Sequence, residues 1–86
     1  MPRISEFFGI TIYVYWRDHL PAHFHAVYAG DEVQVSIEEL SRLSGSLPPR
    51  AMGLVIEWAT LHQEELGKVW QQAQNLEPLS KIDPLR

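Results

Sequence analysis

The sequence predicts a single α+β domain over residues 1–86: a three- or four-stranded antiparallel sheet, one long C-terminal helix packed on one face, and an extended proline-containing tail. Two periodicities predict this fold. In the first half of the chain apolar residues alternate with polar ones, which is typical of half-buried strands. From Arg50 to Asn75 they recur every three or four positions, which is typical of a helix with one apolar face. Hydrophobic residues make up 45% of the chain, enough for one core but not for two.

The first predicted strand covers Ile10–Trp16. β-branched and aromatic residues dominate this stretch, and Gly9 marks its start or a bulge. Residues 17–22 are expected to form a loop, because Pro21 biases Leu20 away from the helical conformation.

The next two predicted strands, His23–Ala29 and Glu32–Ile37, form a hairpin. Gly30-Asp31 suits a two-residue turn between them, which would place Tyr28 opposite Val33. In this register the apolar residues of both strands share one face, and the polar residues share the other. The apolar face comprises Phe24, Ala26, Tyr28, Val33, Val35 and Ile37.

A helix of about seven turns is predicted from Arg50 to Asn75. Pro48-Pro49 marks its start, because the first helical position needs no backbone N–H. Its apolar stripe comprises Ala51, Val55, Trp58, His62, Leu66, Val69 and Ala73. His62 is therefore expected in the core with one hydrogen bond. Gly53 and Gly67 each weaken the helix by about 1 kcal/mol and are the places where a kink could form.

Two segments flank this helix. Residues 38–46 fit a turn or a short edge strand that ends near Gly45. In the tail, apolar residues recur at every third position and are interspersed with Pro78 and Pro84. That spacing predicts an extended segment laid along an apolar groove.

The composition excludes several classes of function. The chain has no cysteine, which excludes disulfides, thiolate zinc sites and cysteine nucleophiles and fits a cytoplasmic location. Its formal charge is −4 and its basic residues are scattered, so tight autonomous binding of nucleic acid is disfavoured. The apolar run Phe7–Trp16 is too short to span a bilayer and lacks a basic leader, so neither a membrane segment nor a signal peptide is expected.

The candidate metal-binding and catalytic side chains are concentrated in the stretch DHLPAHFH, residues 18–25. This stretch holds three of the four histidines. His23 and His25 share one face of a strand and are expected to point away from the core toward water, so their rings can converge on one ion. With His19 from the loop and Asp18 as a ligand or an orienting carboxylate, they could bind a zinc-like divalent metal. The alternative is a set of surface histidines beside a turn that Asp18 caps.

A second chemistry needs no metal. His23 and His25 could act as general acid and base in ribonucleolytic cleavage, with the RNA 2′-hydroxyl as the nucleophile. Arg17 would hold the phosphate, while Tyr13 and Tyr15 would stack on bases. The acidic charge balance favours the alternative that these tyrosines belong to a protein interface.

Several blocks occur in a distinctive order: FFGI, RDHLPAHFHAVYAG, GSLPPRAMGLVIEW, LHQEEL and EPLSKIDPL. With these blocks the chain resembles, over nearly its whole length, the bacterial family labelled domain of unknown function 4160. The most specific block is Arg17-Asp18-His19, followed by Pro21 and His23-Phe24-His25. The resemblance implies a two-component module that looks like a toxin–antitoxin pair. One departure is Ala22, where many members have a second proline.

Three functions follow from these observations. The first is a small cytoplasmic interaction module, one half of a toxin–antitoxin-like pair, with a protein partner encoded nearby. The second is a ribonuclease-like toxin that acts on RNA through His23 and His25, with Arg17 and Tyr15 as further candidate catalytic residues. The third is a protein that binds a divalent metal through Asp18, His19, His23 and His25. The sequence leaves open whether the chain is an enzyme and how it oligomerises.

Overall fold

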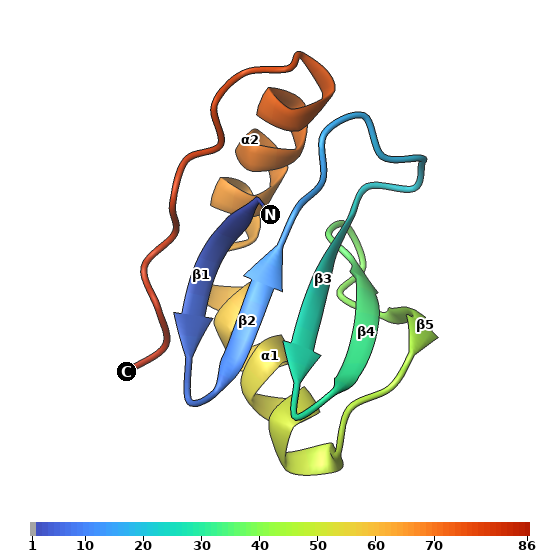
Figure 1. Cartoon of the computed structure of the whole chain (residues 1–86), viewed down its shortest axis with the longest axis vertical. Helices are drawn as coiled ribbons and strands as arrows, with labels where there is room; N and C mark the ends of the chain where they lie inside the picture. Colours follow the sequence, from blue (N-terminus) through green and yellow to red (C-terminus); the bar gives the residue numbers. More distant parts are fainter. Residues whose placement is uncertain (1) are drawn as a thin grey trace.

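The computed structural model describes residues 2–86 and shows an antiparallel sheet with two helices packed behind it (Figure 1). The strand order follows the chain, β1-β2-β3-β4-β5. The elements are β1 (Arg3–Phe7), β2 (Ile10–Tyr13), β3 (His23–Tyr28), β4 (Asp31–Ser36), β5 (Arg42–Gly45), α1 (Pro49–Leu61) and α2 (Gln63–Gln74). Within the described residues there are thus five strands and two helices. The prediction of three or four strands with one long helix is wrong.

The sequence did not predict β1. It pairs with β2 across the turn Phe8-Gly9, where both residues have positive φ (49° and 80°), as a tight hairpin turn requires. A register shift between Arg3 and Ser5 interrupts the pairing. The burial of β1 therefore does not alternate strictly, and the period of two that reveals other strands is missing here.

The hairpin of β3 and β4 turns one residue earlier than predicted. Ala29 and Gly30 have φ values of 50° and 88°, so they are the two turn residues. Tyr28 then pairs with Asp31 instead of Val33. The error in register is two residues, and an even shift leaves every side chain on its predicted face.

The predicted long helix is interrupted at His62, where φ is −122° and ψ is 25°. Neither of the glycines in the helical segment causes the break. The Gln63 side chain donates hydrogen bonds to the carbonyl oxygens of Ile37 (2.8 Å) and Glu38 (2.9 Å), which fixes the junction to the end of β4. A tertiary contact thus redirects α2, and no local propensity signals it. His62 packs on Trp58, with ring centroids 5.6 Å apart, but it is only partly buried and not in the core as predicted.

β5 is a short edge strand of which all four residues are exposed. Its last residue, Gly45, has a φ of 71° and lies against the backbone of β4. A Cβ at this position would collide with the carbonyl oxygen of Glu32, so only glycine fits.

The core lies between the sheet and the helices. Trp58 of α1 packs against Phe7 and Phe24, with ring centroids 5.4 and 5.8 Å away. Its indole N–H donates to the carbonyl oxygen of Asp83 (2.8 Å), which ties the extended tail to the core. The tail runs beside β1 (Figure 1), where Ile82 is buried. Among the described residues, neither helix combines the length and apolarity needed to cross a membrane.

Candidate functional site

The residues after β2 dock on the C-terminal end of α2, where the Arg17 backbone N–H donates to the carbonyl oxygen of Ala73 (3.3 Å). β2 ends at Tyr13, earlier than predicted. The Trp16 indole N–H donates to the carbonyl oxygen of Glu77 (2.9 Å), and the Gln74 side chain donates to the carbonyl oxygen of Asp18 (3.2 Å). These contacts hold the Asp18 side chain above the beginning of β3.

His23 and His25 are buried, with exposed fractions of 1% and 7% over the whole residue, backbone included. The prediction that they face water is wrong, although they do lie on the opposite side of β3 from Phe24, as predicted. The Trp70 ring of α2 lies 5.4 Å from the His23 ring, and Tyr15 packs edge-on against His25 at 4.6 Å. Alternation along a strand identifies a face but says nothing about what covers it.

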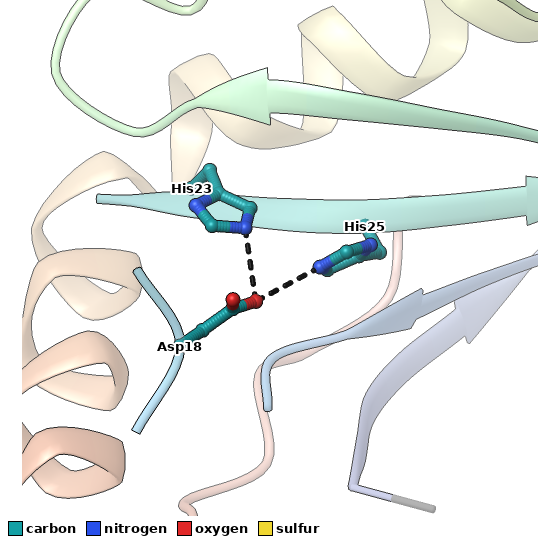
Figure 2. A group of neighbouring side chains, drawn as sticks. All are labelled: Asp18, His23 and His25. Carbon is teal, nitrogen blue, oxygen red and sulfur yellow. Dashed lines mark hydrogen bonds and ion pairs between the residues drawn. The ribbon is translucent and has the colours of Figure 1, made fainter. Parts of the chain in front are cut away.

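Both histidine rings point at one carboxylate. Asp18 Oδ2 lies 3.0 Å from His23 Nε2 and 3.2 Å from His25 Nε2 (Figure 2). One ligand atom from each of the three residues can be chosen so that all lie within 4.8 Å of one another. We call this set, Asp18, His23 and His25, the triad.

The partners of the other ring nitrogens define where the protons are. His23 Nδ1 lies 2.7 Å from the carbonyl oxygen of Pro21, and His25 Nδ1 lies 2.7 Å from Glu32 Oε2. Carbonyl and carboxylate oxygens only accept hydrogen bonds, so both Nδ1 atoms carry a hydrogen. In the neutral rings each Nε2 therefore presents a lone pair toward Asp18.

One of these nitrogens is not satisfied. His23 Nε2 is fully buried and, despite its 3.0 Å distance from Asp18, has no hydrogen-bond partner among residues 2–86. The short distance is thus not accompanied by hydrogen-bond geometry. Buried polar atoms without a protein partner are rare and costly in folded proteins, and many of them contact a bound ion or an ordered water molecule.

Asp18 is ready to act as an anionic ligand. Burial alone would raise the pKa of its carboxyl group. The hydrogen bond that a doubly protonated His25 donates, the hydrogen bond from the His19 backbone N–H and the positive charge of protonated His23 and His19 outweigh burial and lower the pKa below its usual value. The carboxylate therefore stays ionised at neutral pH.

Glu32 is a site residue that sequence reasoning missed. The predicted register placed it on the histidine face but opposite Ala29, four residues from His25. In the structure Glu32 pairs with Val27, which brings it diagonally next to His25. The signal in the sequence was a charged residue, Glu32, on the same strand face as the histidines. The error in register placed Glu32 too far from His25 for the contact to be predicted.

His19 lies near the triad but outside it. Its side chain is 74% exposed, and its Nε2 is 3.7 Å from Asp18 Oδ1. The ring stacks on that of His23, with centroids 5.0 Å apart and an interplanar angle of 27°. The structure thus brings three of the four predicted metal ligands together and leaves the fourth beside them.

The remaining candidate residues are placed differently. Arg17 is exposed, and within the described part of the chain its guanidinium forms no ion pair with the triad. Its backbone N–H donates to the carbonyl oxygen of Ala73. Burial raises the pKa of Tyr15, and the charge of Glu32 raises it further, so this phenol stays neutral beside the triad. Tyr13 stacks on Tyr15, with centroids 6.2 Å apart.

Two imidazoles and one carboxylate form a donor set that suits a borderline transition metal. Each imidazole also donates its second nitrogen's hydrogen to an oxygen atom, the arrangement that orients histidine ligands in metal sites. The described residues can therefore hold a metal ion at this position, and Asp18, His23 and His25 are the residues that would do so.

Comparison with known proteins gives one match. The sequence model of a family described as "Domain of unknown function (DUF4160)" matches residues 9–71, a range that contains the triad and Glu32. No curated protein and no solved structure matches the chain.

Proposed function

The chain belongs to the DUF4160 family, as its sequence resemblance indicated, and we propose that it binds one divalent transition-metal ion through Asp18, His23 and His25. One observation carries the proposal. Two buried Nε2 atoms converge on a single carboxylate oxygen while both Nδ1 atoms donate elsewhere. A cation placed among the three atoms would satisfy all of them.

Electrostatics supports the same proposal. Without a cation, two nitrogen lone pairs face an ionised carboxylate, unless at least one ring takes up an extra proton. An unsatisfied buried nitrogen such as His23 Nε2 costs about 1–3 kcal/mol. A metal ion converts this repulsive arrangement into three ligand bonds, so its binding energy also stabilises the fold.

The donor set restricts the class of ion. Imidazole nitrogen favours zinc, iron, nickel, cobalt and copper over magnesium and calcium, which prefer oxygen ligands alone. Three protein ligands leave at least one position free in a tetrahedral site. We therefore propose a zinc-like ion with a coordination position available to water or to a further ligand.

The test uses protein without an affinity tag, stripped with a chelator and then titrated calorimetrically with Zn²⁺. We expect one equivalent per chain in the wild type and loss of that binding in His23→Gln and Asp18→Asn. His62→Gln is the matched control, because His62 lies at the helix junction and bonds to Glu65 (2.6 Å), outside the triad. Absence of uptake by wild-type protein at micromolar Zn²⁺ would overturn the proposal.

A protein partner is a second candidate function, which the edge of β5 supports. The tail lies along β1, where the Ile82 N–H donates to Ile4 O (2.9 Å), but β5 is exposed along its length. An exposed edge strand can pair with a strand of another chain. Leu43 at this edge is 42% exposed. Co-expression with the neighbouring gene product should give a complex that Leu43→Lys weakens, whereas Leu61→Lys on α1 leaves it intact; no complex would contradict this candidate.

The ribonuclease hypothesis gains no support from the geometry. A general acid or base must come within hydrogen-bond distance of the substrate. The His23 side chain is fully buried, and His25 lies between Asp18 and Glu32. Growth arrest that persists when both histidines are replaced would exclude them as its cause.

A further inference from the structure

We propose that His19 is a displaceable fourth ligand, which closes the coordination sphere of the metal in one position and opens it in another. This inference rests on the proposed metal binding by the triad. It assigns His19 the role of controlling access to the ion, so that the site alternates between a closed form and a form open to an external ligand.

The position of His19 is the first argument. Its backbone N–H donates to Asp18 Oδ1 (2.9 Å), so the residue is held beside the carboxylate ligand. Its ring already stacks on His23, and its Nε2 lies 3.7 Å from Asp18 Oδ1. The nitrogen is therefore next to the site without being part of it.

The protonation pattern is the second argument. His19 Nδ1 lies 3.3 Å from the carbonyl oxygen of Leu20, which can only accept a hydrogen bond. Nδ1 therefore carries the hydrogen, and Nε2 offers its lone pair toward Asp18. All three histidines of the cluster thus donate through Nδ1 and direct Nε2 at the same carboxylate.

The freedom of His19 is the third argument. Its side chain is 74% exposed, whereas those of His23 and His25 are 0% and 9% exposed. Trp70 and Tyr15 pack on the two buried rings, which can therefore act only as fixed ligands. For His19, rotation breaks the long contacts to Leu20 (3.3 Å) and Asp18 (3.7 Å) and the stacking on His23, which is a small cost for an exposed group.

The chemical consequence is a change in coordination. With His19 bound, three imidazoles and one carboxylate fill a tetrahedral sphere, as in closed sites. With His19 rotated outward, one position is free for water or a small anion. The same ion is thus shielded in one form and accessible in the other.

Cobalt(II) serves as the probe, because its visible absorption reports coordination number, and azide tests for a free position. The wild type and His19→Ala should each bind one Co²⁺. We expect a different d–d spectrum in His19→Ala, because a water oxygen replaces an imidazole nitrogen, and a spectral shift at azide concentrations that leave the wild type unchanged. Leu20→Ala, which alters the same exposed loop but no ligand, should match the wild type.

The outcomes separate the two proposals. If wild-type protein binds no Co²⁺ and no Zn²⁺, both the metal site and the role of His19 are wrong. If both proteins bind Co²⁺ with the same spectrum and the same azide response, the triad stands and His19 is not a ligand. If His19→Ala binds no Co²⁺ while remaining folded, His19 is a fixed ligand, and the displaceable role is refuted.

Discussion

Glu32 should tune the affinity of the proposed metal site through His25, without contacting the ion itself. Its Oε2 accepts a hydrogen bond from His25 Nδ1 (2.7 Å). This contact fixes the orientation of the ring and makes Nε2 a stronger electron-pair donor to a metal. Loss of such a partner weakens metal binding by about 10- to 100-fold, which corresponds to about 1.4–2.8 kcal/mol. Two substitutions of Glu32 are expected to give losses of affinity at the two ends of this range.

Glu32→Gln keeps an oxygen that can accept the same hydrogen bond and removes only the charge. Because the Glu32 side chain is 49% exposed, solvent screens that charge, and we expect a loss of about tenfold. Glu32→Ala removes the acceptor as well and leaves the imidazole less firmly oriented. For this variant we expect a loss near the upper limit, about 100-fold.

Competition between the protein and a chromophoric zinc chelator measures both affinities in the same buffer. Glu57→Gln is the control, because it makes the same change in net charge at an exposed position on α1. It should bind zinc like the wild type. Equal affinities for the wild type, Glu32→Gln and Glu32→Ala would refute the argument that His25 depends on this carboxylate.

Three further measurements test the fold and the site. Zn²⁺ at 100 times its dissociation constant should raise the free energy of unfolding in urea by about 2.7 kcal/mol, and no difference from chelator-treated protein would exclude linkage between metal and fold. The pKa of Asp18 is lower in the folded state than its usual 3.8, so its ionisation contributes stability above that pH, and the contribution is lost as the pH falls through the folded value. In chelator, the stability difference between wild type and Asp18→Asn should therefore shrink below pH 3.8; a constant difference would contradict the shift. Gln63→Ala removes two hydrogen bonds at the helix junction and should cost about 1–3 kcal/mol in urea unfolding, whereas an unchanged midpoint would show that this anchor does not hold α2.

The strands show which structural features local sequence patterns can predict and which they cannot. Alternation correctly assigned His23 and Phe24 to opposite faces, although the predicted turn was displaced and the register was wrong by two residues. The predicted faces are correct despite the wrong register, because an even shift preserves the side on which each residue lies. β1 escaped prediction because its register shift breaks the alternation that identifies a strand. The helix break at His62 was not predicted, because tertiary contacts of Gln63 with the end of β4 fix it.

The candidate site was predicted in part. The spacing of the histidines showed that two rings share a strand face, and the neighbouring aspartate suggested a ligand set. Their burial, the unsatisfied His23 Nε2 and the partner Glu32 were not predictable. These three features depend on the position of a loop or on the exact strand register. Loop position and register leave no periodic signal in the sequence.

The sequence by itself determined the composition of the histidine cluster and the strand face that carries it, because these follow from the order of residues and the period of a strand. Only the tertiary structure decided that this face is covered and that Asp18 meets both rings. The loop that carries Asp18 is held by Gln74, 56 positions away in the chain. Contacts over such separations depend on how α2 packs, and the few residues of a periodic pattern do not encode them.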